Sequence, residues 1–119
     1  MTSQVKRSAW LLIATGILHN TICSLLGVSA LREMVGAGFF NSVDPHFHRM
    51  AIFWCLFAGF GIMMWGQLLL SMKEVPRGFA WSFLLLCCVG AVMMPISGFW
   101  LCIPQAIYML KHDSLLQEA

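Results

Sequence analysis

Long apolar runs alternate along this chain with short segments that carry its charges. Three stretches contain no Asp, Glu, Lys or Arg: residues 8–31, 50–72 and 78–110. Each of the first two has the length of one membrane-crossing helix, which needs about 20 residues. The third would form a helix of about 50 Å, whereas the hydrocarbon core of a bilayer is about 30 Å thick. The pattern therefore predicts an interruption within the third stretch.

A turn is expected where Pro95, Ile96, Ser97 and Gly98 follow one another. Proline lacks the amide hydrogen that continues a helix, and glycine tolerates the backbone angles of a reversal. We therefore predict an all-α integral membrane four-helix bundle that forms a single domain, residues 1–119. Its short third and fourth helices are joined by this Pro-x-Ser-Gly turn. The spans are expected at residues 8–31, 50–72, 76–94 and 98–116.

The basic residues predict the orientation of these spans. With four spans, one side of the membrane holds Lys6, Arg7, Lys73, Arg77 and Lys111, and the other holds Arg32 and Arg49. Three spans would give a weaker split of four against three. Because the side richer in Lys and Arg faces the cytoplasm, we expect four spans with both termini cytoplasmic.

The composition indicates the same class of protein. Of 119 residues, 60% are hydrophobic and 10% are charged, whereas soluble domains carry about 25% charged residues. The charges are too few for a disordered chain or for a nucleic-acid-binding surface. A basic N-terminus before an apolar run is also typical of signal peptides. This run is longer than the usual 7–15 or so apolar residues and contains His19 and Asn20, which favours a retained span.

Small residues mark the faces on which the helices are expected to pack, because helices in lipid gain little from hydrophobicity against each other. One face carries Gly16, His19, Cys23, Gly27 and Ala30, and the face expected to meet it carries Ala51, Cys55, Gly59 and Gly66. The last helix has an inward line of Gly98, Leu101, Gln105, Tyr108 and His112. All five cysteines fall within spans, where Cys behaves as a small apolar residue, so no disulfide is expected.

The strongest single candidate for a functional residue is His19, which lies 11 residues into the first span, roughly 16 Å deep. An ionisable group at that depth is a functional hypothesis by default. The alternative is a neutral imidazole that hydrogen-bonds Gln105, Asn20 or Thr15 across a helix contact. The interior polar set that lines a cavity or locks the bundle is expected to be His19, Asn20, Gln67, Gln105 and Tyr108. His19 is the single histidine in the three charge-free stretches, which argues against a bis-histidine haem in one chain.

A second candidate site lies in the first loop, where Asp44, His46 and His48 are ligand types for zinc or copper. In an extended segment the two imidazoles would lie on one side. The alternative is a structural loop, in which Asp44 and Pro45 start the turn into the second helix and Arg49 anchors its outer end.

Other chemistry has no support in the sequence. A proton-coupled exporter similar to the small multidrug transporters would require a carboxylate within the membrane, and none occurs in the stretches 8–31, 50–72 and 78–110. Nucleophile elbows, P-loops and zinc-protease motifs are absent. Catalysis is therefore not expected.

Several motifs stand out along the chain: Gly16-x-x-His19-Asn20, Gly38-Phe39-Phe40-Asn41, Asp44-Pro45-His46, Arg49-Met50-Ala51-Ile52-Phe53-Trp54, Pro95-x-Ser97-Gly98-Phe99-Trp100 and Pro104-Gln105. Together they resemble a family of small uncharacterised bacterial membrane proteins. The likeness covers nearly the whole chain. It implies four spans and a bacterial inner-membrane location, and, since that family is a domain of unknown function, it implies no activity.

We therefore expect a non-enzymatic binding or accessory component of the membrane. The lipid bilayer is its first partner, and a homo-oligomer or another membrane protein is the expected protein partner. One alternative is a transporter-like subunit in which a midplane His and Gln site contacts a small polar solute. A third is metal or haem handling.

Overall fold

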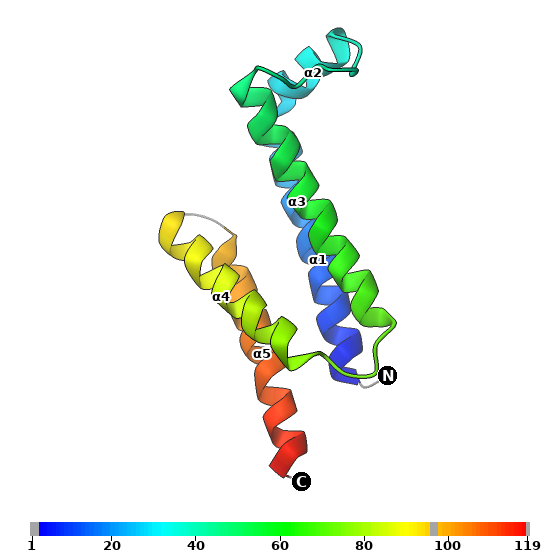
Figure 1. Ribbon diagram of the computed structural model, residues 1–119, viewed down its shortest axis with the longest axis vertical. Helices are drawn as coiled ribbons and strands as arrows, with labels where there is room; N and C mark the ends of the chain where they lie inside the picture. Colours follow the sequence, from blue (N-terminus) through cyan, green and yellow to red (C-terminus); the bar gives the residue numbers. More distant parts are fainter. Residues whose placement is uncertain (1–2, 96–97, 119) are drawn as a thin grey trace. The chain divides into compact units, whose positions relative to one another are not determined.

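The computed structural model describes residues 3–95 and 98–118, with side chains as far as Lys111. It contains five helices and, within those residues, no strand. They are α1 (Ser3–Leu26), α2 (Val28–Gly36), α3 (Phe47–Leu70), α4 (Arg77–Met93) and α5 (Phe99–Glu118) (Figure 1). The predicted all-α class is confirmed. The predicted turn includes Ile96 and Ser97, which lie outside the described residues.

The first predicted helix is wrong in its C-terminal part. It was expected to continue to residue 31, whereas α1 ends at Leu26 and a separate helix, α2, starts at Val28. Between them Gly27 has φ −104° and ψ 19°, outside helical geometry. A Cβ at Gly27 would lie 2.7 Å from side-chain atoms of Ile52. The close approach of α3 therefore requires glycine here, and α2 turns away from the line of α1 (Figure 1).

Two helices are long and apolar enough to cross a membrane. Both α1 and α3 have 24 residues, and their most apolar windows have mean hydropathies of 1.6 and 1.7. At 1.5 Å per residue, each measures about 36 Å, enough for a hydrocarbon core of about 30 Å. A third apolar helix, α4, has 17 residues. Two of the four expected spans thus coincide with described helices that are long and apolar enough to cross a membrane, and the other two stay predictions.

The chain divides into two compact units. The first joins the start of α1 to the end of α3 and to α4 and α5, and the second contains residues 13–64. In the first unit the Gln4 side-chain amide donates a buried hydrogen bond of 2.9 Å to the Met109 carbonyl. The ring of Phe99 packs on Gly90, where a side chain would collide with it. The core of this unit includes Val5, Ala9, Leu12, Leu69, Ala80, Phe83, Cys87, Ala106 and Met109.

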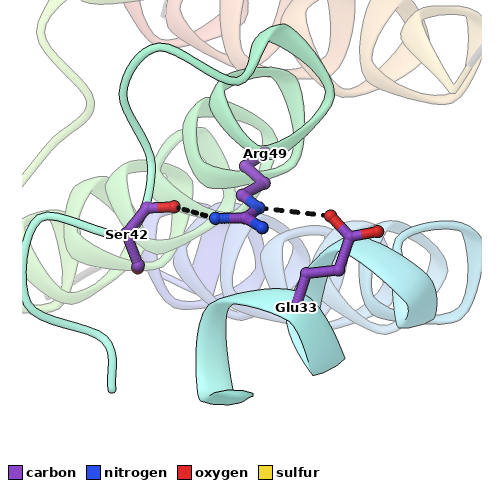
Figure 2. A network of polar contacts seen from close by, with 3 residues as sticks. All are labelled: Glu33, Ser42 and Arg49. Carbon is purple, nitrogen blue, oxygen red and sulfur yellow. Dashed lines mark hydrogen bonds and ion pairs between the residues drawn. The ribbon is translucent and has the colours of Figure 1, made fainter. Parts of the chain in front are cut away.

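In the second unit, Arg49 holds the loop between α2 and α3. Its Nη1 donates to the Ser42 carbonyl at 2.7 Å, and its Nε donates to the Glu33 carboxylate at 3.2 Å (Figure 2). The loop backbone reaches this position through positive φ angles at Gly38, Phe39 and Asn41. Arg49, expected to anchor the helix end, thus binds the loop and α2.

Candidate functional site

The contact between α1 and α3 in the second unit is close because small residues face each other. A Cβ on Gly16 would lie 2.8 Å from the Gly59 carbonyl oxygen and 2.6 Å from the Met63 side chain. Backbone is therefore packed against backbone at this level. The predicted meeting of the two small-residue faces is confirmed at Gly16 and Gly59, whereas Gly27 of the first face packs on Ile52, which lies outside the predicted second face.

One cluster of metal-ligand types lies on this contact. Cys23 from α1 and Cys55 from α3 form a disulfide, with their Cα atoms 6.3 Å apart. The Nε2 atom of His19 lies 3.5 Å from the sulfur of Cys23 and 3.7 Å from that of Cys55. All three ligand atoms lie within 4.8 Å of one another. Two helices that are neighbours in the fold thus bring together an imidazole and two sulfurs.

The orientation of the His19 ring follows from its hydrogen bond. Nε2 lies 2.9 Å from the Cys55 carbonyl oxygen, which can only accept. The Nε2–H therefore donates to that carbonyl, and a neutral ring would carry its proton on this nitrogen. The structural alternative gave His19 a partner among Gln105, Asn20 and Thr15. The partner of Nε2 is instead a backbone carbonyl of α3.

Asn20 lies next to this cluster with its side chain packed on Gly59. A Cβ on Gly59 would collide with the Asn20 amide and would lie 2.9 Å from Cδ2 of His19. Both polar atoms of the Asn20 amide are buried and have no hydrogen-bond partner among the described residues. A shallow groove passes beside Asn20, between Ile17 and Thr21 of α1 and Phe60 and Met63 of α3. An unsatisfied buried amide is costly, by about 1–3 kcal/mol.

The disulfide corrects the prediction that all five cysteines are free. That prediction considered each cysteine alone, from the environment of a span. Pairing depends instead on where the neighbouring helix places its own cysteine. Among the described residues Cys87, Cys88 and Cys102 remain free thiols.

The other predicted interior polar residues lie in the first unit. Gln105 is buried on α5 and Tyr108 is half-buried on the same helix, both in the first unit. Gln67 is exposed on α3. The prediction that Gln67 faces the interior is therefore wrong, because small residues and not polar ones occupy the packed face of that helix. The side chain of His112 lies outside the described residues.

The loop candidates Asp44, His46 and His48 are all exposed. His48 lies in the first turn of α3, and the His46 carbonyl accepts the amide of Met50 at the start of that helix. The segment is thus not extended as the sequence suggested, and residues two apart on a helix point in different directions. Across the part of the chain with described side chains, the three-ligand cluster is His19, Cys23 and Cys55.

The sequence held a signal for this cluster that the analysis of motifs missed. His19 and Cys23 are four residues apart, so they share one helix face. Cys55 was placed on the opposing face of small residues. Combining the two observations would have predicted a His-Cys-Cys site, whereas each cysteine was interpreted as packing.

Comparison with known proteins gives the family. No curated protein and no solved structure is similar enough to this chain to be matched. Residues 3–115 match a family of unknown function, DUF6463. The match covers both compact units and every helix from α1 to the greater part of α5. The chain therefore belongs to the DUF6463 family of unknown function.

Proposed function

We propose that this chain is an integral protein of the bacterial inner membrane and serves there as a non-enzymatic binding or accessory component. It crosses the bilayer four times, through α1, α3, α4 and α5, with both termini in the cytoplasm. The single observation that carries the proposal is the exposure of its longest apolar helices.

That exposure favours a membrane span over a core helix. In the most apolar windows of α1 and α3, 28% and 17% of the residues are buried. A helix of this hydropathy in the core of a soluble protein would be mostly buried, since large exposed apolar surfaces are unfavourable in water. Lipid is the solvent in which such a surface is stable.

The helices α4 and α5 extend the same pattern. Large apolar side chains of α4 are exposed, among them Leu85, Leu86, Val89 and Val92. Its 17 residues measure about 25 Å, which a bilayer accommodates by modest thinning. In α5 the apolar half precedes Lys111, whose stem can reach the headgroups.

Aromatic residues support a membrane interface at the loop between α2 and α3. Phe40 is 93% exposed and Phe47 is 84% exposed. Exposure of two such rings to water is unfavourable, whereas aromatic rings are common at the level of lipid headgroups. With the basic residues on the other side, this loop is the periplasmic end of α1 and α3.

A binding or accessory role fits the interior better than transport does. A cavity lined by both Gln67 and Gln105 would favour the alternative of a transporter-like subunit. Gln67 is exposed and Gln105 is buried, so these two amides do not face a common interior. Backbone contact at Gly16 and Gly59 instead favours a rigid helix pair. We propose that lipid, together with a second copy or another membrane protein, covers the exposed apolar faces.

Reporter fusions test the topology. A reporter active only outside the cytoplasm is fused after Asn41, after Glu74, after Met94 and after the last residue. We expect activity after Asn41 and Met94 and none at the other two positions. Activity at Asn41 alone would leave two spans. Release of the chain into the soluble fraction when membranes are washed with alkaline carbonate would overturn the membrane proposal itself.

A further inference from the structure

The His19, Cys23 and Cys55 cluster has the geometry and the chemistry of a metal site. Around a tetrahedral zinc ion with Zn–S of about 2.3 Å and Zn–N of about 2.0–2.1 Å, nitrogen and sulfur ligands lie about 3.6 Å apart. The two observed separations between His19 Nε2 and the sulfurs are 3.5 Å and 3.7 Å. The Nε2 atom therefore already lies as far from each sulfur as two ligands of one zinc ion lie from each other.

We propose that, when the Cys23–Cys55 disulfide is reduced, His19, Cys23 and Cys55 bind one thiophilic d10 metal ion. Thiolate and imidazole ligands select Zn(II) and Cu(I) over harder cations. Two thiolates and one neutral imidazole give a neutral complex with Zn(II) and an anionic one with Cu(I). Because a net charge is costly away from water, Zn(II) is the favoured ion at this partly buried site.

The disulfide sets the condition for binding. A dithiol reduces it by thiol–disulfide exchange, which leaves two cysteine thiols and converts the dithiol to its own disulfide. Metal binding then displaces one proton from each thiol. The Nε2 proton of His19 moves to Nδ1 by way of solvent, because Nε2 must offer its lone pair to the ion. While the disulfide is intact, Cys23 and Cys55 offer no thiolate, and this site does not bind the ion.

The fourth position of a zinc ion has a candidate in Asn20. Its amide is buried beside the His19 ring and neither of its polar atoms has a partner among the described residues. An amide oxygen or a water molecule would complete a tetrahedral site with two sulfurs and one nitrogen. The site rests on the α1–α3 contact alone, so its test is independent of the topology test.

The experiment uses the full chain in mild detergent, reduced with dithiothreitol and desalted without oxygen. Co(II) is titrated as a spectroscopic probe, and Zn(II) is then added in competition. We expect one equivalent of Co(II) with a sulfur-to-cobalt charge-transfer band, displaced by Zn(II). A parallel titration of Cu(I) against a chelator identifies the preferred ion. The same chain with its disulfide intact is expected to show neither band nor binding.

Variants locate the site. His19→Leu, Cys23→Ser and Cys55→Ser are each expected to lower the affinity by at least about 100-fold, more than loss of an outer-shell partner does. Cys88→Ser, which removes an exposed free thiol, should bind like the unaltered chain. Formation of the Cys23–Cys55 disulfide in oxidised His19→Leu shows that α1 and α3 still pack. Absence of binding by the reduced chain, or equal binding by the oxidised chain or the three variants, would overturn the proposal.

Discussion

Glycines at the α1–α3 contact let the two helices approach closely because glycine has no side chain. At Gly16 the nearest atom that cannot move aside is the carbonyl oxygen of Gly59. A methyl group there must push two helix backbones apart, while a flexible neighbour such as Met63 could give way. By contrast, Gly61 in the same stretch of α3 has no atom within 4 Å of its would-be Cβ. We therefore expect substitution by alanine to lower the free energy of unfolding at Gly16 but not at Gly61.

We predict that Gly16→Ala lowers the free energy of unfolding by about 1–3 kcal/mol, as overpacking does. Gly61→Ala should leave it unchanged or raise it by up to about 1 kcal/mol, because alanine is the better helix former. Thermal unfolding of both variants in detergent measures the difference. Equal destabilisation by the two substitutions would show that the α1–α3 contact is not as close as described.

The small-residue faces could be predicted from the sequence because their spacing is a property of one helix at a time. The pairing of Cys23 with Cys55 could not be predicted in this way, since it depends on the register between two helices. Asn20 was correctly placed near His19 by its position in the chain. Gln67 was misplaced because polarity was taken as a sign of interior position, whereas α3 packs through its glycines.

Among the elements, α2 and its loop are where prediction and structure differ most. Charge patterning predicted a span at 50–72, and α3 covers Phe47–Leu70, whereas the span predicted at 8–31 is displaced from α1, which covers Ser3–Leu26. It did not predict the break at Gly27, because nothing in an apolar run marks the point where a neighbouring helix comes too close. The loop that follows α2 is held by the side chain of Arg49.

Loss of the Arg49 side chain should loosen this loop. Its bond to the Ser42 carbonyl is partly buried, so Arg49→Met is expected to cost about 1.5–3 kcal/mol of local stability. Glu33 is 56% exposed, and Glu33→Gln should cost less than about 1 kcal/mol. Hydrogen exchange of the Ser42 and His46 amides, which bond Phe39 and Val43 within the loop, measures both effects. Faster exchange in Glu33→Gln than in Arg49→Met would contradict this account.

The disulfide should stabilise the α1–α3 pair. It joins residues 32 apart in sequence, and closing a loop of that length contributes about 3–4 kcal/mol by restricting the unfolded chain. Cys23→Ser is therefore expected to reduce the stability of the oxidised protein by that amount. Cys88→Ser serves as the matched control. If reduced and oxidised protein unfold at the same temperature, the bond contributes nothing.

At the scale of the whole molecule, the two ends of the chain meet in the first unit. Gln4 from the first turn of α1 reaches a carbonyl of α5, 105 residues further along. Residues from the start of α1 and from α5 both contribute to the core of that unit. Its stability therefore depends on two segments that lie far apart in the sequence.

Gln4→Ala tests this connection. The substitution removes one buried hydrogen bond and is expected to cost about 1 kcal/mol. Lys6→Ala, at an exposed position in the same helix, is the control and should have little effect. Thermal unfolding of both variants in detergent gives the comparison. A larger loss of stability in Lys6→Ala than in Gln4→Ala would show that the Gln4 hydrogen bond does not stabilise this unit.

The Cys23–Cys55 bond also has a consequence for the integrity of the chain. It closes a covalent ring that contains α2 and the loop before α3. A protease that cuts the backbone anywhere in that ring opens it without separating two fragments. The nicked chain would still migrate as one molecule until a reductant is added, so the loop between α2 and α3 can be cleaved while the chain stays covalently continuous.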